Sequence, residues 1–185
     1  MKNSRALDSR FFVLLSIGVA VAVASIVEKD VTIVFCDIRD STKLGETLPS
    51  ATIEDLLKRY FVAGEEAAVR LGTELDKFVG DEIMLFFEDR PCFEDHAIRG
   101  VRWALAIQDA ARRITASGLA GDIGFRVGVG VCTGSARVGL VGAKQRIQHT
   151  VVGDAVNTAS CACAGGRLRL RARKSTTTRQ SKCGM

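Results

Sequence analysis

From Val31 onward, hydrophobic residues follow two alternating patterns along the chain. Short runs rich in β-branched and aromatic residues are typical of strands, and longer stretches with apolar residues three or four positions apart are typical of helices. The expected elements are a strand at 31–38, a helix at 53–72, two strands within 74–88 that turn at Gly80 and Asp81, a helix at 93–117, and strands at 124–134 and 146–153. This βαββαβ order, with one further strand, predicts an α+β domain of the ferredoxin-like type, with an antiparallel-rich sheet and both helices on one face.

The N-terminal segment carries a long apolar run. Residues 11–27 (FFVLLSIGVAVAVASIV) contain no charged side chain and are just long enough to cross a bilayer as a helix. Residues 1–28 are therefore predicted to be a membrane anchor. Two alternatives stay open, because basic residues followed by an apolar run with small residues also fit a cleaved signal peptide, and the run could be a buried part of the domain.

The chain changes character at Cys161. Residues 155–160 (AVNTAS) predict the opening of a helix, whereas 161–185 have no apolar periodicity and predict a basic, disordered tail after a domain at 29–160. Either this tail is natural, or the reading frame has shifted near residue 161. Residues 155–185 hold seven basic side chains and no acid, so the net charge of +5 becomes −2 without them. Because no aromatic residues interleave with these charges, nucleic-acid binding is not expected.

Two carboxylates occupy positions where the surrounding sequence pattern does not require a charged side chain. Asp37 comes near the end of an otherwise apolar strand, and Asp81 stands at the expected turn of the strand pair. Aspartates at adjacent strand ends of one sheet suit the binding of a divalent metal through hard oxygen ligands. The alternative is structural: Asp37 would cap the helix that follows, and Asp81 would make a tight turn with Gly80.

Three segments carry a resemblance to a known family: FCDIRDST (35–42), LDKFVGDEIM (75–84) and HTVVGDAVNTAS (149–160). In this order and spacing they resemble the motifs of class III adenylate and guanylate cyclases. The resemblance implies that Asp37 and Asp81 bind two Mg²⁺ or Mn²⁺ ions, with the backbone carbonyl of Ile38 as a further ligand. One ion would activate the ribose 3′-hydroxyl for attack on the α-phosphate, and the other would neutralise the departing pyrophosphate.

The resemblance also implies a phosphate contact at the turn from Arg39 to Thr42, which leads into the first helix. Backbone N–H groups at such a turn can face phosphate oxygens. The side chains of Ser41 and Thr42 are interpreted as structural, since both residues are also good N-caps.

In the family, two positions select the base, and here they hold Lys77 and Thr150. A lysine beside a hydroxyl suits adenine, because lysine donates to a ring nitrogen while the partner accepts from the exocyclic amine. Guanine-selective members carry an acid and a small residue such as cysteine instead. The alternatives are that Lys77 is a solvated strand charge and that Thr150 is an ordinary strand residue.

Asn157 matches the family's asparagine that orients the ribose and phosphate in the reaction. Four residues later the family has an arginine that stabilises charge on the α-phosphate, and this chain has Cys161. A phosphate-binding lysine from a later strand would lie beyond the point where the pattern is lost. The sequence therefore predicts a metal-binding half of the site that is present and a transition-state half that is incomplete.

These residues predict conversion of ATP to 3′,5′-cyclic AMP and pyrophosphate, weak or absent in this chain. Because family members build the site between two domains, a head-to-tail homodimer is expected. The expected location is the cytoplasmic face of a membrane, with a soluble cytoplasmic protein as the alternative. Lys2, Arg5 and Arg10 oppose this orientation for a single span, but not for the last span of a longer protein. The rival function is a catalytically inactive module that binds nucleotide or dimerises in a regulatory role.

Overall fold

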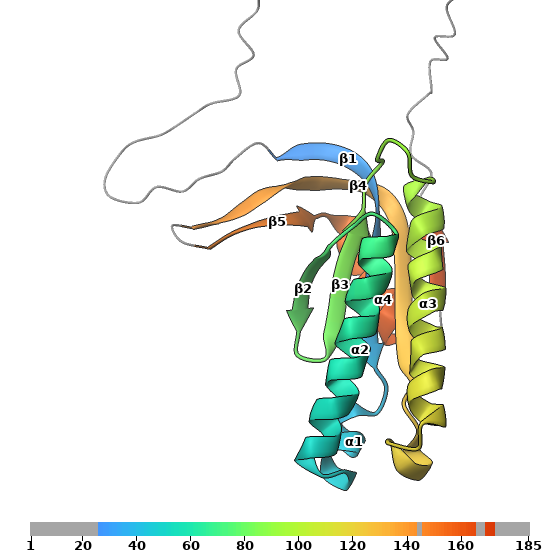
Figure 1. Ribbon diagram of the computed structural model, residues 1–185. Coiled ribbons are helices and arrows are strands. Elements are labelled where there is room, and N and C mark those ends of the chain that lie inside the picture. The colour runs from blue at the N-terminus through green and yellow to red at the C-terminus, as the bar shows by residue number, and fades with distance from the viewer. Residues whose placement is uncertain (1–25, 144–145, 166–168, 173–185) are drawn as a thin grey trace, which may run out of the picture.

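The computed structural model describes residues 26–143, 146–165 and 169–172 (Figure 1). Its elements are β1 (Val27–Ile38), α1 (Ser41–Thr47), α2 (Ser50–Arg70), β2 (Leu75–Val79), β3 (Glu82–Phe87), α3 (His96–Ala116), a 3₁₀ turn η1 (Gly121–Ile123), β4 (Val127–Ala143), β5 (Arg146–Val152), α4 (Asp154–Ala164) and β6 (Arg169–Ala172). The predicted α+β class and the βαββαβ order are confirmed.

The sheet has the strand order β2-β3-β1-β4-β5, and each neighbouring pair in this path is antiparallel. β6 runs parallel to β4 along Gly130–Thr133. β1 lies in the centre, where Val31, Ile33 and Phe35 face one side and Val34, Cys36 and Ile38 face the other. The strand predicted at 31–38 is confirmed, and burial of both faces of β1 explains why its sequence is a nearly continuous apolar run.

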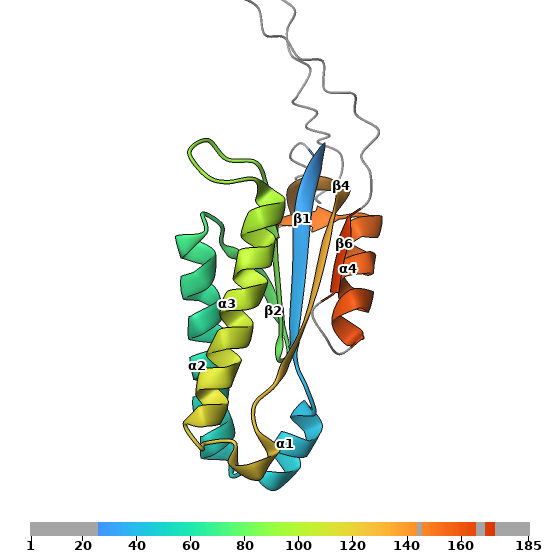
Figure 2. The same cartoon turned by 90° about the vertical axis from the view of Figure 1, so that its right-hand side faces the viewer.

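Helices cover both faces of the sheet. α2 and α3 pack on one face through a core that includes Leu56, Tyr60, Trp103 and Ile107. α4 packs on the opposite face, and Figure 2 shows it across the edge-on sheet from the other two helices. The expectation of one helical face therefore holds for the two long helices and is wrong for α4. The buried side chains on the second face of β1 require this third layer.

β1 begins at Val27, four residues earlier than the strand predicted from Val31, and its first part pairs with β4 as far as Val27 with Val138. The predicted anchor at 1–28 therefore overlaps the strand at its last two residues, and its residues 1–25 lie outside the described part of the chain. Among the described residues, no helix is long and apolar enough to cross a bilayer.

The long strand β4 contains glycines where α4 approaches its backbone. A Cβ atom at Gly130 would overlap the Ala159 carbonyl oxygen and the Cys163 amide nitrogen. The run GVGVCTG at 128–134 is therefore continuous strand, and Gly130 allows a helix to lie directly on it.

The C-terminal boundary also differs from the prediction. α4 continues through Cys161 and ends at Ala164, because Ala162 and Cys163 are buried against the sheet. Beyond it, the backbone at Arg169–Ala172 forms β6, within the segment predicted to be disordered. The alternating arginine and leucine residues in RLRLRA (167–172) have the period of two that is typical of a strand, and this was the available signal in the sequence. Residues 166–168 and 173–185 lie outside the described part of the chain.

Candidate active site

Asp37 and Asp81 lie together at one end of the sheet. Asp37 is near the end of β1, Asp81 is in the turn between β2 and β3, and β1 pairs with β3 so that Cys36 lies opposite Ile83. Gly80 has a positive φ of 65°, a conformation that favours glycine, so Gly80 makes the tight part of the turn. The turn alone therefore does not account for an aspartate at position 81.

The electrostatics of this pair favour a bound cation. Burial and the nearby charge of Asp81 raise the pKa of the Asp37 carboxyl, and Arg39 opposes this shift only in part. The Oδ2 atom of Asp81 is buried and has no hydrogen-bond partner in the described part of the chain. Two carboxylates with hard oxygen donors, mutual repulsion and an unpartnered buried atom fit a divalent metal ion, whose charge would remove the repulsion.

A third acid, Glu82, stands beside this pair and was missed in the sequence. Burial raises the pKa of its carboxyl, and the charges of Asp37 and Asp81 contribute to the same shift. Its position directly after Asp81 in the GDE segment was the available signal. Glu82 adds negative charge at the site and thereby increases its attraction for cations.

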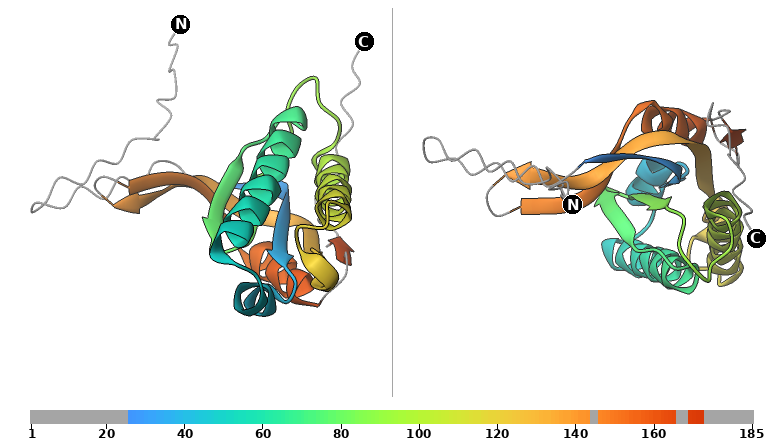
Figure 3. Two further views of the ribbon diagram at one scale, coloured as in Figure 1. Left: turned by 60° about the horizontal axis from the view of Figure 1, so that its bottom comes forward. Right: turned by 90° about the horizontal axis from the view of Figure 1, so that it is seen from above.

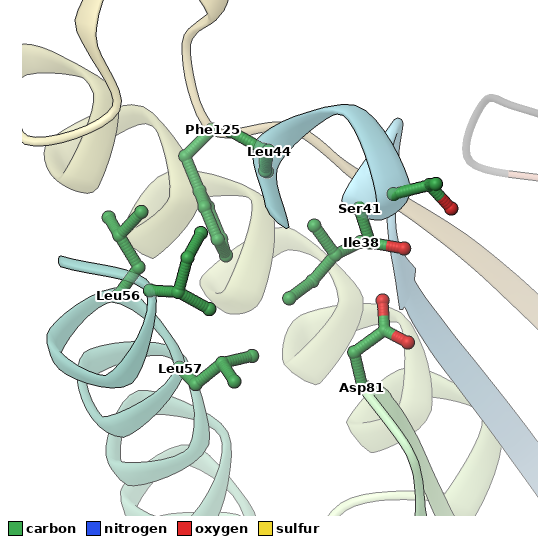
Figure 4. Close-up of a pocket in the computed structure, with 9 residues that line it drawn as sticks. Ile38, Ser41, Leu44, Leu56, Leu57, Asp81 and Phe125 are labelled. Atoms are coloured by element: carbon green, nitrogen blue, oxygen red, sulfur yellow. The ribbon is translucent and has the colours of Figure 1, made fainter. Parts of the chain in front are cut away.

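A pocket of about 310 Å³ opens beside Asp81. Figure 4 shows Asp81 reaching toward it from the β2–β3 turn, with Ile38 and Ser41 on the neighbouring wall. The remaining wall is mainly apolar and is formed by Thr42, Leu44, Ile53, Leu56, Leu57 and Phe125. The pocket therefore joins the acidic end of the sheet to the first turn of α1.

The turn into α1 differs in detail from the expectation. The N-cap is Asp40, which has a left-handed φ of 55° and makes no side-chain cap, so Ser41 and Thr42 are first-turn residues rather than N-caps. The backbone N–H of Arg39 donates to the carbonyl of Arg126 at 2.8 Å, and it is not free for a phosphate. The expectation of a phosphate-binding turn is therefore wrong for the Arg39 N–H.

The Arg39 side chain turns toward α4. Its guanidinium donates to the backbone carbonyl of Cys163, and its Nη1 atom lies 3.7 Å from Oδ2 of Asp37. A Cβ atom at Gly128 would overlap the guanidinium, so the glycine makes room for it. Arg39 thus connects the aspartate at the end of β1 to the C-terminal half of α4.

Lys77 and Thr150 meet although they come from β2 and β5, the two ends of the main strand path. The Lys77 Nζ donates to Thr150 Oγ1 at 3.1 Å. Both views of Figure 3 show that the sheet is curved and that the β4–β5 hairpin extends away from the helices. The sequence-predicted base-reading pair is therefore assembled within one chain.

Asp76 completes this cluster and was not among the residues predicted from the sequence. Thr150 Oγ1 donates to Asp76 Oδ2 at 2.9 Å, and Lys77 Nζ lies 3.2 Å from the same oxygen. The pairing of β2 with β3 shifts register between Leu75 and Lys77. Such a bulge can bring two consecutive side chains to the same region, as seen for Asp76 and Lys77.

Asn157 and Cys161 lie one helical turn apart on the exposed side of α4. The opposite side of the helix, with Ala155, Ala159 and Cys163, is buried on the sheet. In the described part of the chain, no hydrogen bond or ion pair joins Asn157 or Cys161 to the aspartates of β1 and the β2–β3 turn. Within one chain, the predicted transition-state residues on α4 therefore do not bond to the predicted metal ligands.

A second group of metal-capable side chains, Asp89, Asp95 and His96, follows the other end of β3. Two of its three members already have structural roles. Asp95 caps α3 by accepting from the Ala97 N–H, and the buried His96 ring pairs with the hydroxyl of Thr32 at 2.8 Å. We therefore assign the candidate site to the other end of β3, where Asp81 lies in the turn before the strand.

A three-layer domain with a curved antiparallel sheet and paired carboxylates at a strand end is the architecture of a nucleotide cyclase. Residues 23–179 match the adenylate and guanylate cyclase catalytic domain. The chain belongs to this family, whose class III members use divalent metal ions.

Similar proteins include an adenylate cyclase of Anabaena cylindrica, 36% identical over 70% of this chain and 26% of its own length. An adenylate cyclase of Dictyostelium discoideum specific to terminal differentiation is 34% identical over 71% of this chain and 6% of its own. The chain thus spans about a quarter or less of these relatives.

Solved structures of cyclases have the same fold as this chain. The adenylyl cyclase CyaB from P. aeruginosa has a TM-score of 0.71 and 30% identity, covering 79% of this chain and 78% of that one. The guanylyl cyclase Cya2 has a TM-score of 0.69 and 26% identity, covering 78% and 76%. Both adenylyl and guanylyl cyclases are therefore among the similar structures, and the base preference rests on the site residues.

Proposed function

We propose that this chain is the catalytic module of an adenylate cyclase, which converts ATP to 3′,5′-cyclic AMP and pyrophosphate. The observation that carries the choice of adenine is the hydrogen bond of 3.1 Å between Lys77 Nζ and Thr150 Oγ1. The lysine offers a proton to the adenine ring nitrogen N1, and the hydroxyl oxygen offers an acceptor to the 6-amino group. Guanine presents the opposite polarity at both positions.

Asp37, Asp81 and the Ile38 carbonyl are the proposed ligands of two Mg²⁺ or Mn²⁺ ions. When bound, these ions would lower the pKa of the ribose 3′-hydroxyl and neutralise the charge of the pyrophosphate. The residues of the chain hold the ligand oxygens in place: β1 fixes Asp37, and the turn at Gly80 fixes Asp81. Ser41 and Thr42 in the first turn of α1 line the pocket, and N–H groups in a first helical turn, which lack intrahelical partners, could bind phosphate there.

We propose a homodimer because Asn157 and the metal ligands do not bond to each other within one chain. Asn157 projects from the exposed side of α4, without a bond to Asp37 or Asp81 of its own chain. A second copy placed head to tail would bring its own Asn157, Lys77 and Thr150 to the metal ligands of the first, and two equivalent sites would form. The catalytic module is proposed to work at the cytoplasmic face of a membrane.

The test is production of cyclic AMP by the purified chain with Mn²⁺ and ATP or GTP. We expect activity to require both aspartates, to be supported better by Mn²⁺ than by Mg²⁺, and to favour ATP. The matched control is Asp55→Asn, an exposed carboxylate on α2 that pairs with Arg59 at 3.0 Å. Parent activity in Asp37→Ala would contradict the metal assignment, and an unchanged base preference in Lys77→Glu/Thr150→Cys would contradict the choice of adenine.

A second function is favoured by one specific observation. Cys161 occupies the exposed position, one turn after Asn157, where the family has an arginine. A neutral thiol cannot stabilise charge on the α-phosphate as a guanidinium does. A catalytically inactive module that binds ATP or dimerises is therefore the alternative, and nucleotide binding without turnover would support it.

A further inference from the structure

The hydroxyl of Thr150 is chemically ambiguous by itself. A threonine hydroxyl has one proton to donate and two lone pairs that can accept. If the proton were free to rotate toward a bound base, the hydroxyl could donate to the 6-oxo group of guanine. It could equally accept a hydrogen bond from the 6-amino group of adenine. Lys77 can only donate and so discriminates at N1, but Thr150 alone does not distinguish a 6-amino from a 6-oxo group.

Asp76 removes this ambiguity. Its Oδ2 atom accepts the only hydroxyl proton of Thr150, with an O···O distance of 2.9 Å. Lys77 Nζ donates to one lone pair of Thr150 Oγ1 at 3.1 Å. One lone pair of Thr150 remains, so the hydroxyl can act toward a ligand only as an acceptor. Lys77 has three protons, of which one reaches Thr150 and a second faces Asp76 Oδ2 at 3.2 Å. One donor and one acceptor are left, and they match the N1 and 6-amino positions of adenine.

Burial shows that this arrangement is not a surface ion pair. The Asp76 side chain is 1% exposed, whereas that of Lys77 is 32% exposed. The second carboxylate oxygen, Oδ1, is buried without a hydrogen-bond partner in the described part of the chain. A buried carboxylate with one unpartnered oxygen costs stability, so folding alone does not explain its presence.

We infer that Asp76 is a positioning residue for base selection, which acts through the Thr150 hydroxyl and fixes the site to accept a 6-amino purine and reject a 6-oxo purine. This inference rests on the proposed function, because it assumes that Lys77 and Thr150 face the base. It adds a third residue, from the bulge of β2, to the pair expected from the sequence.

The test compares the binding of ATP with that of inosine triphosphate, which carries a carbonyl at position 6. The full chain is used with Mn²⁺, and each nucleotide displaces a fluorescent ATP analogue labelled on the ribose. Asp76→Leu removes the acceptor at similar volume and should reduce the preference for ATP about tenfold, the value of one hydrogen bond. Asp76→Asn removes the charge but keeps an acceptor oxygen, so it should retain the preference within about threefold.

Thr150→Val tells a positioning role from a structural one. If Asp76 acts through the hydroxyl, Asp76→Leu should have no further effect on the ATP preference once Thr150 is valine. Should Asp76→Leu lose its circular dichroism spectrum, Asp76→Ala, with a smaller side chain, takes its place in the same comparison.

Each outcome decides a separate point. An unchanged preference in Asp76→Leu, an equal loss in Asp76→Asn, or a further loss in the double variant would overturn the role of Asp76 while leaving the cyclase assignment intact. A parent chain that binds neither nucleotide would overturn the proposed function, and the inference would fall with it.

Discussion

Arg39 at the end of β1 donates a hydrogen bond to the backbone carbonyl of Cys163 on α4, with its guanidinium lying over Gly128 of β4. The same side chain lies 3.7 Å from Asp37. In addition to the apolar packing of α4 on the sheet, one arginine therefore links the strand that carries a proposed metal ligand to the helix that carries Asn157.

This contact predicts a non-additive pair of substitutions. Arg39→Ala should lower the melting temperature by roughly 3–12 °C, because the Cys163 carbonyl loses a charged donor worth about 1.5–3 kcal/mol. Gly128→Ala should be destabilising by about 1–3 kcal/mol, since its methyl group would overlap the guanidinium. In the double variant the overlap is gone, so the combined loss should be smaller than the sum. Thermal unfolding measures all three, and strict additivity would contradict the contact.

The repulsion between Asp37 and Asp81 predicts that one carboxylate is destabilising without metal. The pKa of Asp37 is raised in the folded protein, so its ionisation opposes folding as the pH rises above the ordinary aspartate value. In EDTA at neutral pH, Asp37→Asn should therefore raise the melting temperature, and the gain should shrink as the pH falls to the ordinary aspartate value. Asp55→Asn, at an exposed carboxylate, should leave the melting temperature nearly unchanged.

The same variant should lose the response to metal. A metal ion at about ten times its dissociation constant stabilises the folded parent by about 1.4 kcal/mol. We expect Mn²⁺ to raise the melting temperature of the parent and of Asp55→Asn but not that of Asp37→Asn. A full Mn²⁺ response in Asp37→Asn would place the metal elsewhere.

The orientation of α4 predicts which cysteines react. Cys92 and Cys161 are exposed, whereas Cys36, Cys132 and Cys163 are buried. Burial also raises the pKa of the Cys163 thiol to about 11, so the reactive thiolate is scarce at neutral pH. Iodoacetamide followed by peptide mass spectrometry should label Cys92 and Cys161 in the folded chain. Labelling of Cys163 before Cys161 would show that the helix has a different rotation.

The cysteine at position 161 predicts low turnover. An arginine in a comparable phosphoryl-transfer role is worth on the order of 10³–10⁵ in rate, which is roughly 4–7 kcal/mol of barrier. The parent chain should therefore bind ATP and turn over little, and Cys161→Arg should recover part of the loss. A chain whose reading frame is corrected past residue 160 should recover most of it, since it would also regain the later lysine. Robust cyclic AMP production by the parent would show that the arginine is dispensable.

The sequence by itself determined the strand and helix order and the positions of Asp37, Asp81, Lys77 and Thr150. Hydrophobic periodicity is a local property, and an aspartate in an apolar strand is conspicuous without any knowledge of its neighbours. The run at 31–38 predicted a strand for the same reason, and the structure places a strand there.

Only the tertiary structure decided what the site residues contact. Asp76 and Thr150 are 74 positions apart, and they meet because the curved sheet brings its outer strands together. The bulge in β2, which depends on the register with β3, aligns Asp76 with Lys77. α4 continues past residue 160 because burial of Ala162 and Cys163 on the second face of the sheet stabilises it. The free energy that stabilises this end of the helix comes from contacts between segments distant in the sequence, so the local sequence pattern does not predict it.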